Sequence, residues 1–251
     1  MSTPPSGAGS AERDYYEAFL ASREYRESRL RKAAVLDAVV GREIRAAAVV
    51  GDLGSGTGLL KRELEKLSGQ PVLGFEVDPR VVIERGRTCV ADGTRLPVAN
   101  ASFDFLIVNH IYEHVKEPRE LFAEVARILK PGACAYVTAG SRWAFLEPHY
   151  RLPLLSWLPR GMADRYVRWT GRAKSYRGIR FLGYRSLQRA MGVPGLRISD
   201  ITERAIRSVL SGGGGGRWQA VWRVLSILPG GLRRGILRCG PQWFFLLTRR
   251  D

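Results

Sequence analysis

The most informative part of this 251-residue chain is Val49-Val50-Gly51-Asp52-Leu53-Gly54-Ser55-Gly56-Thr57-Gly58. An apolar run, residues 46–50, leads into it and predicts a buried parallel strand. Residues 59–67 follow it with leucines spaced for one side of a helix. A strand, a glycine turn and a helix in this order bring bare backbone to a helix N-terminus. We therefore expect an extended, polar ligand to bind at this turn.

The spacing of the glycines distinguishes the possible ligands. A dinucleotide site uses G-x-G-x-x-G, and a phosphate-binding loop uses G-x-x-x-x-G-K-[ST]. Gly54, Gly56 and Gly58 instead give G-x-G-x-G, and leucines occupy positions 59 and 60, where a phosphate-binding loop has Lys and Ser or Thr. The run D-L-G-S-G-T-G resembles the first motif of the class I S-adenosylmethionine-dependent methyltransferases.

This resemblance implies S-adenosylmethionine as the cofactor and assigns roles within the loop. Gly54, Ser55, Gly56 and Gly58 would let the methionine end of the cofactor approach the backbone. Asp52 would lie near its ammonium group, where the opposite charge is favourable.

Three further segments follow in the order that the family has. Residues 71–76 predict a second strand that ends in Glu76, about twenty residues beyond the glycines. When G-F-E-V-D-P is aligned with the family's G-x-D-x-S-P, Glu76 takes the position whose carboxylate accepts hydrogen bonds from both ribose hydroxyls. Asp78 falls two residues later and is the alternative if that alignment shifts.

Residues 91–104 contain the next matching segment. A-D-G-T-R-L-P and S-F-D resemble the family's A-D-x-x-x-L-P and S-F-D. The resemblance implies that Asp92 accepts a hydrogen bond from the adenine amino group and that the backbone of Gly93 lies beside the ring. Residues 105–108 then predict another buried strand, and Asn109 after it is a further candidate cofactor contact.

The family pattern also implies the fold. The stretch L-F-A-E-V-A-R-I-L-K-P-G-A closely resembles the helix and turn that precede the fifth strand in this family, and the general pattern resembles its ubiquinone/menaquinone-biosynthesis branch, methyltransferase type 11. We expect a Rossmann-like, doubly wound α/β sheet of seven strands with the last one antiparallel. The remaining predicted elements are a helix (118–129), a turn (130–132) and three strands (133–138, 196–201 and 243–249).

The predicted organisation has five parts. They are a disordered tail (1–10), an N-terminal helical cap (11–45), a cofactor-binding core (46–140), a substrate lid inserted after the fifth strand (141–195) and C-terminal strands (196–251). In many members of the resembled family such a cap folds over the cofactor, which would place Tyr15 or Tyr16 against it. Simple packing of the helix on its domain is the alternative.

The net charge of +16 is distributed unevenly. Residues 1–140 carry 19 basic and 19 acidic side chains, whereas residues 141–251 carry 21 basic and 5 acidic ones. The last part also contains a glycine-rich joint at 212–216 and an amphipathic segment at 217–238, where Trp and Leu oppose Arg. That pattern suits a helix lying in a membrane interface, and the alternative is a helix docked on its own domain or on a second copy.

The cysteines and the N-terminus bear on localisation. Cys89, Cys134 and Cys239 are scattered and odd in number, which favours reduced, buried thiols over a disulfide framework or a metal site. No N-terminal apolar stretch resembles a signal peptide. We therefore expect a cytoplasmic protein that can associate peripherally with the inner face of a membrane.

Methyl transfer to a hydroxyl or a carbon atom also needs a base. His110 follows the fourth strand, at the edge where open α/β sheets hold their ligands, and His149 lies in the predicted lid. Either imidazole is suited to accept a proton near neutral pH, so both are candidate catalytic residues. For His114, which matches the family's E-H-V, a structural role is the simpler interpretation.

Three functional hypotheses fit the sequence, two of which differ in the acceptor. A small or lipid-like molecule, methylated at a membrane surface or in solution, fits the aromatic and apolar lid best. An RNA would fit the arginines and aromatic residues that alternate along 160–189. A catalytically silent cofactor-binding scaffold is a third hypothesis, although it would be expected to have lost cofactor residues. The fold alone does not select among them.

Overall fold

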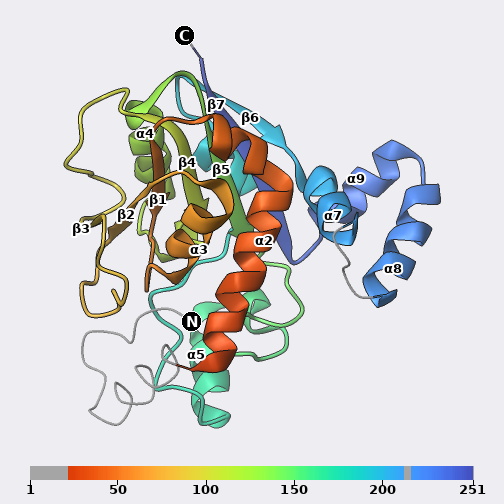
Figure 1. The fold of residues 1–251 in the computed structure, drawn as a ribbon. Coiled ribbons are helices and arrows are strands. Elements are labelled where there is room, and N and C mark those ends of the chain that lie inside the picture. Colours follow the sequence, from red (N-terminus) through yellow and green to blue (C-terminus); the bar gives the residue numbers. More distant parts are fainter. Residues whose placement is uncertain (1–21, 212–215, 251) are drawn as a thin grey trace.

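The computed structural model describes residues 22–211 and 216–250, which include a seven-stranded mixed sheet of order β3-β2-β1-β4-β5-β7-β6 (Figure 1). β7 is antiparallel to both of its neighbours, and the other pairings are parallel. The fold class predicted from the sequence is confirmed. The strands are β1 (Val50–Leu53), β2 (Val72–Glu76), β3 (Thr88–Val90), β4 (Phe103–Asn109), β5 (Leu129–Gly140), β6 (Leu196–Asp200) and β7 (Gln242–Arg249).

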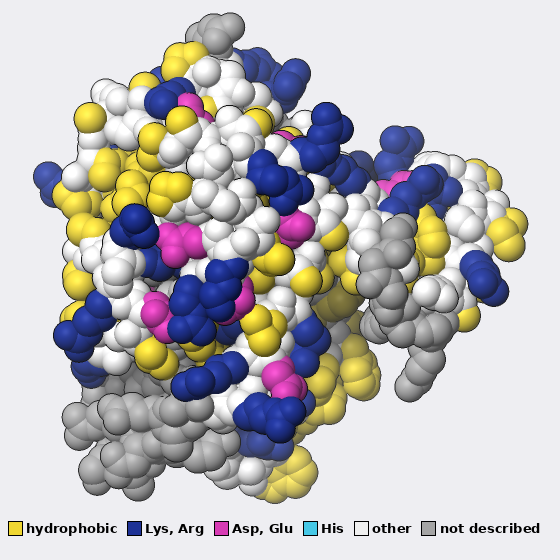
Figure 2. Space-filling view, viewed as in Figure 1, with side chains coloured by type: hydrophobic (Ala, Val, Ile, Leu, Met, Phe, Trp, Pro, Cys, Tyr) yellow, Lys and Arg dark blue, Asp and Glu magenta, His cyan; other side chains and the backbone are white. Residues whose placement is uncertain are grey.

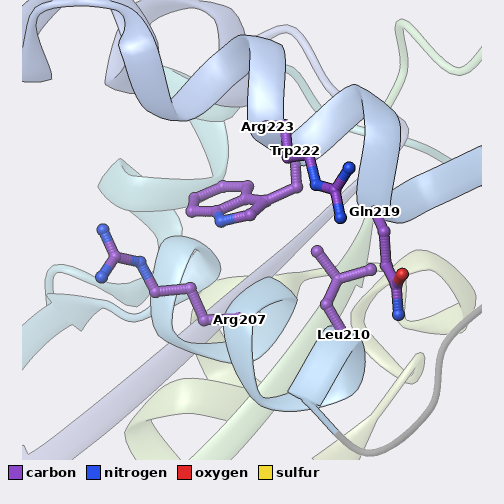
Figure 3. A pocket seen from close by; sticks show the side chains of 5 residues that line it. All are labelled: Arg207, Leu210, Gln219, Trp222 and Arg223. Carbon is purple, nitrogen blue, oxygen red and sulfur yellow. The ribbon is translucent and has the colours of Figure 1, made fainter. Parts of the chain in front are cut away.

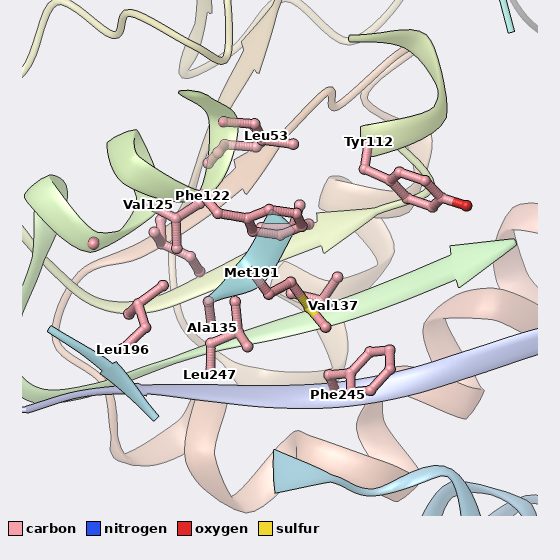
Figure 4. Packing of buried hydrophobic residues seen from close by; sticks show 14 of the residues in the cluster. Leu53, Tyr112, Phe122, Val125, Ala135, Val137, Met191, Leu196, Phe245 and Leu247 are labelled. Carbon is pink, nitrogen blue, oxygen red and sulfur yellow. The ribbon is translucent and has the colours of Figure 1, made fainter. Parts of the chain in front are cut away.

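Helices cover both faces of the sheet. On one face, side chains of α4 and α6 pack on the strands, and Figure 4 shows Phe122, Val125 and Met191 from these helices against β5 and β7. On the other face, the core is formed with α2, α3 and α7. The described helices are α2 (Arg23–Ala46), α3 (Leu59–Ser68), α4 (Pro118–Ile128), α5 (Arg160–Trp169), α6 (Tyr184–Met191), α7 (Thr202–Ser211), α8 (Gly216–Ile227) and α9 (Gly230–Arg238), with 3-10 turns η1 (Tyr112–His114) and η2 (Leu155–Trp157).

The alternation of β7 shows how one strand serves both cores. Trp243 and Phe245 are fully buried in the first core, whereas Phe244, between them, packs against the second. Successive side chains of a strand point to opposite faces, so a strand buried on both sides reads as one continuous apolar run. This explains why the strand is visible in the sequence.

Two predicted boundaries were wrong, and one strand was not predicted. The apolar run 46–50 is not one strand, because α2 extends to Ala46 and β1 begins only at Val50. The predicted turn at 130–132 lies within β5, where Gly132 takes a left-handed φ of 76° and the pairing with β4 shifts register. β3, a short edge strand, was not predicted. It has only three residues, and two of them are exposed.

The cysteine interpretation also needs correction. Cys89 and Cys239 are exposed and Cys134 is partly buried, and all three thiols are free. Cys89 lies on the edge strand β3, where one face of the sheet is uncovered, so its position in a strand does not bury it. Tyr15 and Tyr16, the predicted cap residues, and most of the glycine-rich joint lie outside the described residues.

The helices α8 and α9 form a pair beside α7, away from the sheet (Figure 1). The Arg207 guanidinium lies over the Trp222 ring at 5.4 Å, and Arg233 pairs with Glu203 of α7 at 3.0 Å. A cavity of about 330 Å³ separates α7 from α8, lined by Arg207, Leu210, Gln219, Trp222 and Arg223 (Figure 3). Among the described residues, no helix is both long and apolar enough to cross a membrane.

Candidate functional site

The glycine loop between β1 and α3 has a left-handed backbone. Gly54, Gly56 and Gly58 have φ of 64°, 55° and 77°, values that glycine adopts without steric cost. A Cβ on Gly54 would lie 2.9 Å from the Ile111 side chain, and one on Gly58 would lie 2.8 Å from the Glu84 carbonyl oxygen. For a Cβ on Gly56, the nearest described atom would be the Tyr25 hydroxyl oxygen at 4.0 Å. The flanking glycines are therefore required by packing, and the central one faces space that a ligand can use.

Asp52 provides a test of whether the site suits the cofactor. Its side chain is 1% exposed, and Oδ2 has no hydrogen-bond partner among the described residues. Burial raises the pKa of this carboxyl to about 7, against the favourable fields of Lys61 and Arg29. A buried carboxylate oxygen without a partner is costly unless a cation or donor compensates it. The ammonium group of S-adenosylmethionine fits that requirement.

Ser55 is a second buried polar residue of this region that has a side-chain atom without a described partner. Its backbone amide donates to the Phe75 carbonyl at 3.0 Å, which fixes the loop against β2, whereas its buried Oγ has no partner in the described part of the chain. Gly74 allows this approach, because a Cβ there would lie 2.8 Å from the Ser55 Oγ.

Glu76 ends β2 and holds the loop directly. Its Oε2 accepts from the Gly56 amide at 2.8 Å, and Oε1 accepts from the amides of Val77 and Asp78 at 2.9 and 3.1 Å. A carboxylate offers about four acceptor positions, so about one is left for a ribose hydroxyl. Asp78 forms a bidentate pair with Arg80, which leaves Glu76 as the better candidate.

The remaining cofactor candidates lie at the ends of β3 and β4. Asp92 is exposed, and its Oδ1 accepts from the amide and the hydroxyl of Thr94, both at 2.8 Å. Gly93 has room for a side chain, since a Cβ would be 3.5 Å from Leu121. Asn109 accepts a hydrogen bond from the Thr138 hydroxyl through Oδ1, and both residues line a cavity of about 320 Å³.

The N-terminal half of α2 supplies residues that the sequence reading missed. The Thr57 hydroxyl lies 3.4 Å from the Tyr25 hydroxyl, and the Arg29 guanidinium stacks over the Tyr25 ring at 4.6 Å. Lys32 lines the same cavity as Asn109, and burial lowers its pKa to about 8. Tyr25, Arg29 and Lys32 recur at helical spacing, so one polar face of a predicted helix was the available signal.

His110 stands at the carboxyl end of β4 and lines the 320 Å³ cavity. Its φ of 56° is unusual for a residue with a Cβ. Nδ1 lies 3.0 Å from Oε1 of Glu113, which is 1% exposed and whose Oε2 has no partner among the described residues. Burial lowers the pKa of His110, although Glu113 opposes the shift. With Nδ1–H donating to the carboxylate, the neutral ring has Nε2 free to accept a proton.

His149 reaches the same region from the lid. Its Nδ1 lies 2.8 Å from Oε1 of the fully buried Glu147, whose Oε2 accepts from the amides of His149 and Tyr150. The ring of His114 packs edge-on against that of His149, with centroids 5.2 Å apart, and burial lowers the pKa of His114 to about 4. The two candidate bases thus lie in one region, and His114 contributes packing there. No group of three or more His, Cys, Asp or Glu in the described ranges is arranged to hold a metal.

Hydrogen bonds fasten the lid to the core beside these histidines. The Tyr112 hydroxyl donates to the Gly140 carbonyl at 2.5 Å and accepts from the Leu182 amide at 3.2 Å. The Arg180 amide donates to the Glu113 carbonyl at 2.7 Å. The lid segment 180–182 therefore depends on η1, which carries Glu113 and His114.

Comparisons with known proteins agree with this geometry. Residues 51–137 match the family model described as a methyltransferase domain. An uncharacterized methyltransferase of Mycobacterium sp. (strain JLS) is 32% identical over 127 residues, which are 48% of this chain and 50% of that protein. A demethylmenaquinone methyltransferase of Tropheryma whipplei (strain Twist) is 32% identical over 126 residues, or 47% and 52% of the two chains. The chain thus spans about half the length of these curated relatives.

Solved structures share the fold over more of the chain. The plantazolicin methyltransferase BpumL in complex with SAH aligns with a TM-score of 0.60 at 13% identity, covering 97% of this chain and 92% of that one. A geranyl diphosphate methyltransferase in complex with SAM aligns with a TM-score of 0.52 at 17% identity, covering 98% and 92%. Residues 51–137 match a methyltransferase domain, and this match agrees with the resemblance of the motifs to the S-adenosylmethionine-dependent methyltransferases.

Proposed function

We propose that this protein transfers a methyl group from S-adenosylmethionine to a small or lipid-like acceptor. The observation that carries the proposal is the buried Asp52 carboxylate, whose Oδ2 has no partner in the described part of the chain, beneath a loop where no described atom crowds Gly56. The names of the relatives support the acceptor class, because they include demethylmenaquinone and geranyl diphosphate methyltransferases.

The chain offers a residue for each part of the cofactor. Asp52 would hold the ammonium group, the Gly54–Gly58 backbone the methionine end, and Glu76 a ribose hydroxyl. Asp92, Gly93 and Asn109 would contact the adenine end and its surroundings. When bound, the cofactor supplies an electrophilic methyl group on a sulfonium, so the protein must chiefly position the acceptor and exclude water. Such positioning is worth about 7–11 kcal/mol.

The 320 Å³ cavity beside His110 is the place that we assign to the acceptor. Its lining combines apolar side chains, among them Val35, Leu36 and Tyr136, with the cation of Lys32. His110 would accept the acceptor's proton at Nε2, because Glu113 holds Nδ1. His149 is the second candidate, held in the same way by Glu147. We place the reaction in the cytoplasm, at the inner face of the membrane, in keeping with three free thiols and a cationic lid.

The test is transfer of label from S-adenosylmethionine carrying a radioactive methyl group into a host extract. The extract is then separated into lipid, nucleic-acid and aqueous small-molecule fractions. Gly56→Arg fills the open side of the loop and should abolish both cofactor binding and transfer. Gly235→Arg adds the same side chain to α9, where a Cβ meets nothing within 4 Å, and should leave both intact.

Label in the lipid or small-molecule fraction would support the proposal. Label in the RNA would reassign the arginines of the lid to an RNA acceptor. Cofactor binding without transfer into any fraction would favour the silent scaffold.

A further inference from the structure

The lid forms a small packing unit of its own above the site. We use the name lid surface for residues 142–180. Leu152 and Leu155 pack with Ala163 and Val167 of α5 in a core separate from those of the sheet. The lid surface therefore has a defined inner side, and the side chains turned away from it are presented to the surroundings.

Large apolar side chains are unusually exposed there. The Phe145 side chain is 67% exposed and that of Trp169 is 84% exposed. The other exposed apolar residues of the lid surface are Trp143, Leu146, Leu154, Trp157 and Met162. Side chains of this size rarely gather on the surface of a protein unless that surface binds something.

The backbone holds these residues outward in a fixed arrangement. The Leu154 amide donates to the Phe145 carbonyl at 2.6 Å, and Leu146 pairs with Pro153 in an antiparallel bridge. The Trp143 and Trp157 rings meet edge to face at 5.6 Å. A hairpin built in this way presents its apolar tip as a unit, so the exposure is not that of a loose loop.

The charge of the lid surface is of one sign. All nine of its cations are exposed, and none belongs to an ion pair of the described residues: Arg142, Arg151, Arg160, Arg165, Arg168, Arg172, Lys174, Arg177 and Arg180. Its two carboxylates are occupied within the lid, because Glu147 holds His149 and Asp164 accepts from the Tyr176 amide at 2.7 Å. Figure 2 shows hydrophobic side chains beside Lys and Arg at the lower end of the molecule, where Figure 1 places α5.

We propose that the lid surface docks on an anionic lipid bilayer. Tryptophan and phenylalanine insert into the boundary between headgroups and acyl chains, and arginines are attracted by anionic headgroups. An RNA would use the cations and would stack bases on the exposed aromatic rings, but it would leave the aliphatic Leu146, Leu154 and Met162 in water. Exposed aliphatic side chains next to cations that form no ion pair with the described residues therefore favour a membrane.

Docking would bring the bilayer to the acceptor site. The same hairpin carries His149 and Glu147, and the following segment is fastened to η1 through Tyr112 and Leu182. A lipid-like acceptor could pass from the membrane to the histidines without crossing water. In this respect the inference rests on the proposed function, but the docking itself is measurable without any methyl transfer.

The α8–α9 pair is the natural control surface. It also exposes apolar side chains, namely Val224, Ile227 and Leu232, next to arginines. Its tryptophan at 222, however, is engaged with Arg207 of α7. Equal substitutions on the two surfaces separate docking by the lid from docking by any exposed apolar residue.

The experiment is sedimentation of the full chain with phosphatidylcholine vesicles, with and without phosphatidylglycerol. We expect binding to the anionic vesicles and a loss of roughly tenfold or more in the partition coefficient for the triple variant Phe145→Ser, Leu146→Ser and Trp169→Ser. The matched variant Val224→Ser, Ile227→Ser and Leu232→Ser should stay within about twofold of the wild type.

Several outcomes would overturn the inference. They are absence of wild-type binding to anionic vesicles, equal binding by the lid variant, and loss of binding in the α8–α9 variant instead. Tight, salt-sensitive binding to single-stranded RNA with no vesicle binding would also overturn it. If the triple variant does not fold, Trp169→Ser alone, with Ile227→Ser of α8 as its equally exposed match, gives the same comparison.

Titration with S-adenosylmethionine accompanies each variant. The lid variant should bind the cofactor as the wild type does, which shows that it is folded. Vesicle binding without cofactor binding would contradict the proposed function and leave the docking in place, so the two failures are distinguishable.

Discussion

The methyltransferase domain and the lid surface differ in whether their cations form ion pairs. Within the domain, cations form ion pairs with nearby carboxylates: Arg80 with Asp78, Arg127 with Glu124 and Lys130 with Asp104. The lid surface has nine exposed cations and no ion pair of this kind among the described residues. The domain satisfies these charges internally, which suits a task such as holding one cofactor. The cations of the lid surface remain accessible to an external partner, which suits a surface that selects what the protein binds.

Replacing one histidine from each region gives the largest expected contrast. His110→Ala should lower the rate of methyl transfer by about 10²–10⁴-fold, because a positioned base is lost. His149→Ala should lower the rate by roughly tenfold, since His149 is the second candidate base and lies on the lid side of the site. Transfer is measured with labelled cofactor and an organic extract as the acceptor source, and cofactor affinity serves as the control. A larger loss for His149→Ala would move the base into the lid.

Asp52→Asn should have opposite effects on stability and on cofactor binding. Burial raises the pKa of Asp52 to about 7, so the folded chain binds more protons than the unfolded chain between about pH 4 and 7. Stability of the cofactor-free protein should therefore fall as the pH rises through that window, by up to about 4 kcal/mol. The Asn variant should lack this decline but bind the cofactor at least about tenfold more weakly. Urea unfolding at several pH values checks it, and parallel pH curves for the two proteins would contradict it.

Tyr112→Phe tests the hydrogen bonds that join the lid to the domain. The variant removes a hydroxyl that bridges the Gly140 carbonyl and the Leu182 amide, and both groups would lose a partner in a buried place. We expect a loss of about 1.5–3 kcal/mol in the free energy of unfolding and faster proteolysis within the lid. Tyr166→Phe is the matched change, because its hydroxyl makes no hydrogen bond to the described residues, and it should be nearly silent. Equal stability of the two variants would show that the Tyr112 hydrogen bonds do not hold the lid in place.

The smallest expected effect addresses the charges themselves. Arg127→Ala should cost about 1–2 kcal/mol, because its guanidinium binds Glu124 and the carbonyls of Leu96 and Val98. Arg165→Ala on the lid surface should change stability by less than about 0.5 kcal/mol. Thermal unfolding of both variants measures the difference. A comparable loss for Arg165→Ala would mean that the lid cations are structural after all.

The sequence predicted the domain well because its signals are local. Gly56 can be recognised from its spacing in the loop, and the strand at β4 from an unbroken apolar run. Residues brought together from distant elements were harder to predict. The contact between His149 and His114 joins the lid to η1, and Tyr25 meets Thr57 across 32 residues. Neither pairing has a sequence period, since each depends on how separate elements pack against one another in three dimensions.

The boundary errors have a related cause. Ala46 is apolar in a helix that packs on the sheet, and Val50 is apolar in the strand that follows. Ala46 is exposed and Val50 is buried, but the apolar run from 46 to 50 is unbroken, so hydrophobicity alone does not separate the end of the helix from the strand. Cys89 shows the converse, because it lies in a strand whose edge position exposes it.

The break in α2 has a kinetic consequence. Val40 departs from helical geometry, with φ of −134°, and the Arg204 guanidinium bonds the Val39 carbonyl at 2.6 Å beside it. The part of α2 after the break is thereby tied to α7, whereas the part before it carries Tyr25 and Arg29 over the glycine loop. The middle of α2, with Ala33 and Leu36, is buried in the second core, so we expect only its first turns, with Tyr25 and Arg29, to move when cofactor and product exchange. The residence time of the cofactor would then depend on how firmly those turns stay over the loop.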